Sequence, residues 1–131
     1  MLVALDINLE TESPFDFACG EVGEIQLCAL KTLQTFSDVT KIVFMHHHPL
    51  IHNNTFMEMK DARELVQSIY KQVHVVLFGH THEPGSWQNC WGAKFAFASV
   101  KSPDLNVARE IVVDDGKIRK GYIHYETGGK S

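Results

Sequence analysis

The chain has 131 residues, of which 44% are hydrophobic and 21% are charged. These proportions are close to those of average globular proteins, so they argue against intrinsic disorder and allow one domain with a buried core. The formal net charge is -4 and no stretch carries a dense run of Lys or Arg, which argues against a nucleic-acid duplex as partner.

The apolar runs of the chain are short. The longest, such as residues 73–78, fall far below the roughly 20 residues that cross a bilayer, so we expect no membrane span. Residues 1–6 lack the basic start and long apolar stretch of a secretory signal, which predicts a cytoplasmic location. The three cysteines are odd in number and form no C-x-x-C pair, which argues against a disulfide framework and a Cys-based zinc site.

The first part of the chain alternates apolar strands with amphipathic helices. Residues 2–5 form a short apolar run, which predicts a buried strand. Apolar residues at helical spacing predict a helix over residues 24–36 and another over residues 61–72. Residues 41–45 and 73–78 are mostly β-branched or apolar, as is typical of interior strands covered on both faces.

The last part of the chain follows a different pattern. Its alternating apolar and polar residues predict short strands over residues 87–91, 94–99, 109–113 and 117–125. The last two are joined by Asp-Asp-Gly at 114–116, a strong hairpin signal because Gly accepts positive φ. The order β-α-β-α-β followed by a β meander predicts a layered α/β domain with two parallel central strands.

Histidines follow both of the buried central strands. Seven of the eight histidines lie between residues 46 and 82, in His-His-His-Pro at 46–49, in Gly-His-Thr-His at 79–82, and singly elsewhere. In open α/β sheets, ligands bind beyond the carboxyl ends of the strands. A lone His at a strand end is more often solvated or hydrogen-bonded, but two clusters at equivalent positions favour a site for Zn, Mn or Fe.

The two histidine segments resemble a known pair of motifs. Val-Phe-Met-His-His-His-Pro-Leu at 43–50 and Val-Leu-Phe-Gly-His-Thr-His at 76–82 are similar to the V-x-x-H and G-H-x-H motifs of the calcineurin-like metallophosphoesterases. A triple His followed by Pro-Leu also occurs in the branch that includes bacterial cyclic-nucleotide phosphodiesterases. The resemblance covers nearly the whole chain, and the pair in this order is more specific than either motif alone.

The resemblance implies a fold, an activity and a set of ligands. The fold would be the layered α/β sandwich of that family, and the activity would be hydrolysis of phosphomonoesters or phosphodiesters, including cyclic nucleotides, by a hydroxide that two metal ions activate. His46 and His80 would bind one divalent ion and His82 the other, with Mn, Fe and Zn all suitable. His47 and His48 would face the substrate as catalytic residues, although His47 is an alternative to His46 as the ligand. The partner would be a phosphoester substrate.

Three earlier motifs of the family are missing. The sequence contains no D-x-H, no G-D-x-x-D and no G-N-H-[DE], and we assign Asp6 no metal role. Residues 1–131 are therefore expected to form the C-terminal part of a single metallophosphoesterase domain. A missing N-terminal half, or a second copy of the chain, would then be needed to complete the site.

Two other functions fit the sequence. The first is a catalytically inactive partial domain that binds a metal ion or a partner protein. The second is a mononuclear zinc hydrolase with three histidine ligands, which is disfavoured because neither loop carries an obvious carboxylate base.

Overall fold

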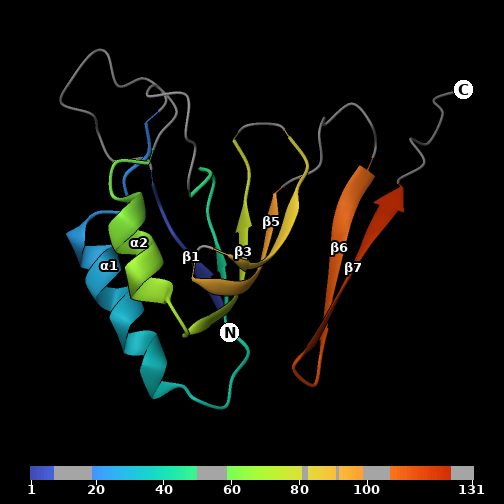
Figure 1. The fold of residues 1–131 in the computed structure, drawn as a ribbon, viewed down its shortest axis with the longest axis horizontal. Helices are drawn as coiled ribbons and strands as arrows, with labels where there is room; N and C mark the ends of the chain where they lie inside the picture. Colours follow the sequence, from blue (N-terminus) through green and yellow to red (C-terminus); the bar gives the residue numbers. More distant parts are fainter. Residues whose placement is uncertain (8–18, 50–58, 81–82, 91, 99–106, 125–131) are drawn as a thin grey trace, which may run out of the picture.

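A five-stranded sheet forms the centre of the molecule (Figure 1). The structure is a computed structural model that describes residues 1–7, 19–49, 59–80, 83–90, 92–98 and 107–124. The sheet has the order β1-β2-β3-β5-β4. Its strands are β1 (Leu2–Ala4), β2 (Ile42–Phe44), β3 (Val73–Phe78), β5 (Ala93–Ala98) and β4 (Ser86–Cys90). The first four are parallel and β4 is antiparallel to β5, which confirms the expected parallel pairing of the two central strands.

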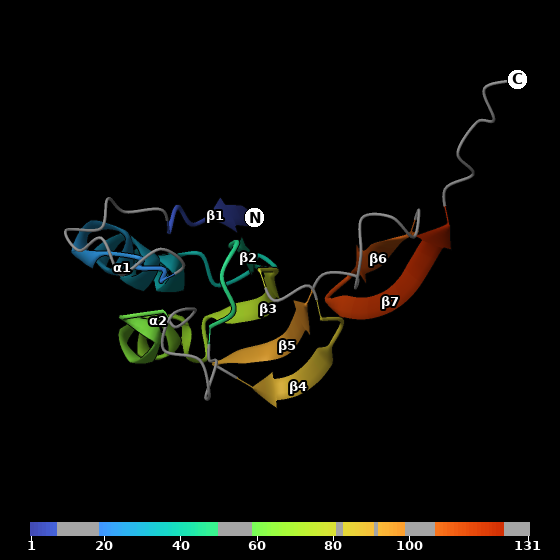
Figure 2. The same cartoon turned by 90° about the horizontal axis from the view of Figure 1, so that it is seen from above.

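Two helices cover one side of this sheet. They are α1 (Glu24–Lys31), which continues into the 3-10 helix η1 (Thr32–Thr35), and α2 (Ala62–Ile69). Figures 1 and 2 show α1 and α2 on the same side of the sheet. The core between helices and sheet includes fully buried side chains, among them Leu30, Leu65, Ile69, Val43 and Val76. Burial of each such side chain contributes roughly 1.5–3 kcal/mol to stability.

The chain ends in antiparallel strands, as expected, but the strands of the predicted β meander are divided between two sheets. The first pair is β4–β5, and β5 lies beside β3 so that β4 occupies the edge of the sheet. The second, β6 (Val107–Asp114) with β7 (Lys117–His124), is a separate two-stranded ribbon on the side of the sheet away from the helices (Figure 2). Asp115 and Gly116 have φ values of 44° and 72°, the geometry of the expected two-residue turn.

Asp61 fixes the start of α1. Although Asp61 occupies the N-cap position of α2, its carboxylate accepts hydrogen bonds from the backbone N–H groups of Val22 (2.9 Å) and Gly23 (2.8 Å). Gly23 is the N-cap of α1 and has no side chain with which to cap it. The side chain at the N-terminus of α2 thus accepts the hydrogen bonds of backbone N–H groups at the N-terminus of α1.

His74 lies inside β3, where we expect a histidine with its polar atoms satisfied. Its side chain is half-buried, and its Nδ1 accepts a hydrogen bond of 3.1 Å from the backbone N–H of Lys41. Burial, together with the positive charges of Lys41 and Lys94, lowers the pKa of His74 below its ordinary value of 6.5. His74 is therefore neutral at pH 7, with the remaining proton on Nε2.

The lowered pKa of His74 predicts a pH-dependent stability. The unfolded chain takes up a proton at about pH 6.5 while the folded chain resists it, so this contribution is complete above about pH 6.5 and is lost as pH falls through the lowered pKa. His74→Asn keeps an acceptor for the N–H of Lys41 but cannot titrate. Urea unfolding between about pH 8 and pH 5 should show a steeper loss of stability in the parent than in the variant. If the free energy of unfolding depended on pH in the same way in the parent and in His74→Asn, the lowered pKa of His74 would be contradicted.

No helix in the described ranges is long and apolar enough to cross a membrane.

Candidate metal centre

Backbone hydrogen bonds hold the loops after β2 and β3 side by side. The N–H of Met45 donates to the carbonyl of Leu77 at 2.9 Å, and the N–H of Gly79 donates to the carbonyl of His46 at 2.9 Å. The ladder between the two strands thus continues past their carboxyl ends. Residues 34 apart in sequence therefore meet at one edge of the sheet.

Three imidazole rings gather at this edge. The ring centroids of His46 and His80 are 5.0 Å apart, those of His46 and His47 are 5.4 Å apart, and those of His47 and His80 are 4.3 Å apart. Nε2 of His46 lies 3.2 Å from Nδ1 of His80. Two nitrogen ligands of one tetrahedral ion with bonds of 2.0–2.1 Å lie roughly 3.3 Å apart, so this spacing fits a pair of ligands to one cation.

His80 adopts a strained backbone conformation. Its φ is 73°, in the left-handed region that side chains other than Gly rarely occupy. Such residues concentrate at functional sites, where the surrounding structure offsets the strain. The left-handed residue of this loop is thus the histidine and not the preceding Gly79.

His47 is the buried member of the group. It is 5% exposed and its ring is stacked on that of His80, with an interplanar angle of 29°. Gly20 lies directly against it, because a Cβ on Gly20 would be 2.7 Å from Cγ of His47. The backbone of Gly20 is itself held by a 2.8 Å hydrogen bond from the N–H of Lys60. Sequence reasoning assigned Gly20 no role at the site, because this contact joins residues far apart in the chain.

Adding a methyl group at Gly20 should disturb the site through His47. The Cβ of Gly20→Ala would force the ring of His47 to move, and overpacking of this kind costs about 1–2 kcal/mol. We expect thermal unfolding to show this loss and divalent-ion titration to show weaker binding, because the stacking partner of His80 is displaced. Gly116→Ala is the control for metal affinity. Its φ of 72° makes it lose stability through backbone strain, but its Cβ would meet nothing within 4 Å, so metal binding should not change. If Gly20→Ala bound metal as tightly as the parent, the position of the His47 ring would not matter for metal binding.

His48 and His82 are placed differently from the other three. The half-buried ring of His48 packs edge-on against Phe78 at 4.5 Å and against Trp87 at 6.0 Å. His82, the expected ligand of a second ion, lies outside the described residues. Among the residues that the structure does describe, no group of three or more His, Cys, Asp and Glu could hold a metal ion.

A pocket of about 310 Å³ opens beside His46, between the sheet and β6. Its walls are mainly apolar, and Arg109 from β6 is the cationic residue that lines it. The guanidinium donates a 2.8 Å hydrogen bond to the carbonyl of Gly85 and lies over the ring of Phe97, 5.5 Å from its centroid. Sequence reasoning missed Arg109, because nothing local in the sequence shows that β6 lies beside the histidine loops.

Comparisons with known proteins identify a matching family model and a similar solved structure. A family model described as calcineurin-like phosphoesterase matches residues 9–84, a range that contains both histidine loops. The structure is similar to that of a dimetal phosphatase from Danio rerio, with 17% sequence identity and a TM-score of 0.54. This similarity covers 82% of the present chain but 40% of the phosphatase, so the chain spans less than half the length of that protein. No curated protein matches the sequence.

Proposed function

Because the chain belongs to the calcineurin-like phosphoesterase family, we propose that it takes part in metal-dependent hydrolysis of a phosphoester and supplies imidazole ligands to the metal centre. The observation that carries this proposal is the 3.2 Å separation of Nε2 of His46 and Nδ1 of His80. A bound divalent ion would supply Lewis acidity that stabilises negative charge on phosphate oxygens.

In this proposal His46 and His80 hold one ion, and His82 remains the predicted ligand of a second. Neutral imidazole nitrogen suits Mn, Fe and Zn, and these are the metals we propose. The left-handed backbone of His80 and its stacking on His47 support a fixed orientation of that ring. Both restraints reduce the ordering that binding of the ion would otherwise require.

We propose roles for three other side chains near the ion: His47, His48 and Arg109. His47 is too buried to contact much of a substrate, so we place it behind His80 as a positioning residue. His48 is less buried and stays the predicted substrate-facing catalytic residue. Arg109, at the wall of the neighbouring pocket, brings a positive charge that would favour a phosphate group there.

We further propose that residues 1–131 form the C-terminal part of a larger phosphoesterase domain. Three neutral imidazoles do not neutralise two divalent ions, and the sequence lacks the motifs with which the family supplies carboxylates. The 40% coverage of the Danio rerio phosphatase supports this proposal. A separate N-terminal half, or a second copy of the chain, would then bring the missing ligands.

Metal content and hydrolysis together test the proposed function. The chain is purified without chelator, its metal is measured by elemental analysis, and hydrolysis of bis(4-nitrophenyl) phosphate is followed with added Mn²⁺. We expect a bound divalent ion. Hydrolysis is expected where a second copy of the chain completes the ligand set, and it should stop when the metal is removed. Binding without hydrolysis would favour the alternative, a partial domain that binds a metal ion or a partner protein. A chain that neither binds a divalent ion nor hydrolyses the ester would overturn the proposal.

Two finer proposals rest on the sequence. The triple His followed by Pro-Leu supports a cyclic nucleotide as the phosphodiester substrate, which 3′,5′-cyclic AMP in the same assay would test. The three cysteines, which are odd in number and form no C-x-x-C pair, support a reducing, cytoplasmic location.

A further inference from the structure

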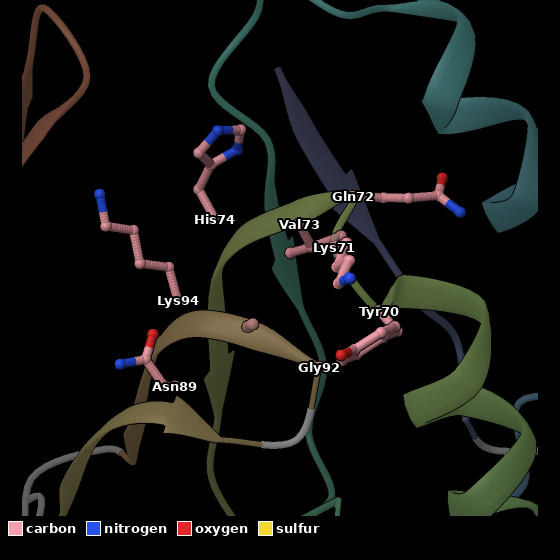
Figure 3. A pocket seen from close by; sticks show the side chains of 9 residues that line it. Tyr70, Lys71, Gln72, Val73, His74, Asn89, Gly92 and Lys94 are labelled. Carbon is pink, nitrogen blue, oxygen red and sulfur yellow. The ribbon is translucent and has the colours of Figure 1, made fainter.

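A second pocket lies at the opposite end of the parallel strands from the histidine loops. It has a volume of about 420 Å³, within the range of small-molecule sites. Its walls include the first residues of β3 and β5, and Figure 3 shows the side chains around it. The candidate metal centre follows the last residues of β2 and β3. The two sites therefore lie at opposite ends of the parallel strands.

The groups around this pocket are cations and hydrogen-bond donors. Lys71, Lys94 and His74 line it, and none of the described lining residues carries a carboxylate. His74 and Lys94 project in the same direction from neighbouring strands (Figure 3). Because Nδ1 of His74 accepts from the N–H of Lys41, the proton of the neutral ring is on Nε2, which can donate. Asn89 adds a side-chain amide.

The strand register concentrates positive charge at this end of the sheet. The pairs Ile42↔Val75 and Val73↔Ala93 bring Lys41, His74 and Lys94 to the same level across three adjacent strands. Lys41 is 4% exposed, so its charge acts where solvent screening is weak. The positive field of Lys41 and Lys94 at His74 is one cause of the lowered pKa of that ring.

Strained backbone shapes the same pocket. Lys71 and Asn89 have φ values of 60° and 50°, and Gly92 has a φ of 78°. A Cβ on Gly92 would lie 2.7 Å from the carbonyl oxygen of Val66, so this close approach of β5 to α2 requires glycine. Nζ of Lys71 lies 5.3 Å from the ring centroid of its neighbour Tyr70, which also lines the pocket. Lys71 and Asn89 thus hold conformations that residues other than Gly seldom adopt outside turns and sites.

We propose that this pocket binds a small phosphate-bearing molecule through Lys71, Lys94 and the Nε2–H of His74. A phosphate group offers three or four acceptor oxygens and negative charge, which match a wall of donors without carboxylates. The volume leaves room for an organic group attached to the phosphate. The site is independent of the metal centre, and its occupant does not need to be the substrate.

Titration of the full chain with inorganic phosphate, and then with glycerol 3-phosphate, tests this proposal. EDTA is present so that no metal ion can recruit phosphate to the histidine loops. Amide chemical shifts locate the binding site, with residues 71, 92 and 94 expected to move and residues 46, 79 and 80 expected to stay. Lys71→Gln/Lys94→Gln should weaken binding about tenfold, since two charged contacts are lost.

The matched control is Lys31→Gln/Lys117→Gln, which changes the net charge equally at exposed positions in α1 and at the start of β7. It should change the phosphate affinity less than twofold. The single variant Lys94→Gln, at an exposed position, serves if the double variant does not fold. Shift changes confined to residues 46, 79 and 80, equal losses in the control, or the absence of saturable binding of either phosphate would each overturn the proposal.

Discussion

Replacing His80 by Gly should weaken binding of a divalent ion about 100-fold or more. Loss of a group that only orients a metal ligand already costs 10–100-fold, and His80 is proposed as a ligand itself. Glycine is the right replacement because the φ of 73° suits it, whereas Ala would add backbone strain to the loss of the nitrogen. Calorimetric titration with Mn²⁺ or Zn²⁺ measures the effect.

Two further variants sharpen this test. His46→Ala should weaken binding by a similar factor, and the double variant should lose little more than either single one because both nitrogens serve the same ion. His74→Asn, at the other end of β3, should bind metal like the parent. If His80→Gly and His46→Ala keep the parent affinity, these histidines are not ligands and the proposed metal centre fails.

Replacing Asp61 by Ala should cost about 3 kcal/mol of folding stability. The carboxylate accepts hydrogen bonds from the N–H groups of Val22 and Gly23, and bonds to a charged acceptor contribute about 1.5–3 kcal/mol each. The variant would leave two partly buried donors at the entry to α1 without an acceptor. For a chain of this size the melting temperature should fall by about 10 °C.

Asp38→Ala is the matched control for Asp61→Ala. Asp38 is exposed in the segment before β2, so its removal should change stability by less than about 0.5 kcal/mol. Equal melting temperatures for the two variants would show that the Asp61 hydrogen bonds add nothing beyond an ordinary surface carboxylate.

Local patterns were enough to predict most of the elements of the fold. The bounds of β3 were predicted to the residue because Val73–Phe78 is a run of apolar residues, interrupted only by His74, that Gly79 ends. The predicted helix over 24–36 is present, with its last turn as the 3-10 helix Thr32–Thr35. The alternating pattern of the later strands gave no sign that β6 and β7 leave the sheet, since any antiparallel pair satisfies that pattern.

The candidate metal centre could also be predicted only in part. His46 and His80 could be predicted to lie close together because parallel neighbouring strands end at the same edge. The contacts that fix them could not, because each joins residues far apart in sequence. Gly20 lies against His47, and Arg109 reaches the carbonyl of Gly85, through tertiary packing that no local pattern records.

The hydrogen bond from Gly79 to His46 makes the metal centre observable without a substrate. An ion held by His46 and His80 would close the loop that contains all of α2, and binding to the folded state alone would stabilise that loop in proportion to the logarithm of metal concentration. The Gly79 amide should then exchange its hydrogen with solvent more slowly as metal is added. The exchange rate of this one amide would thus report occupancy of the centre.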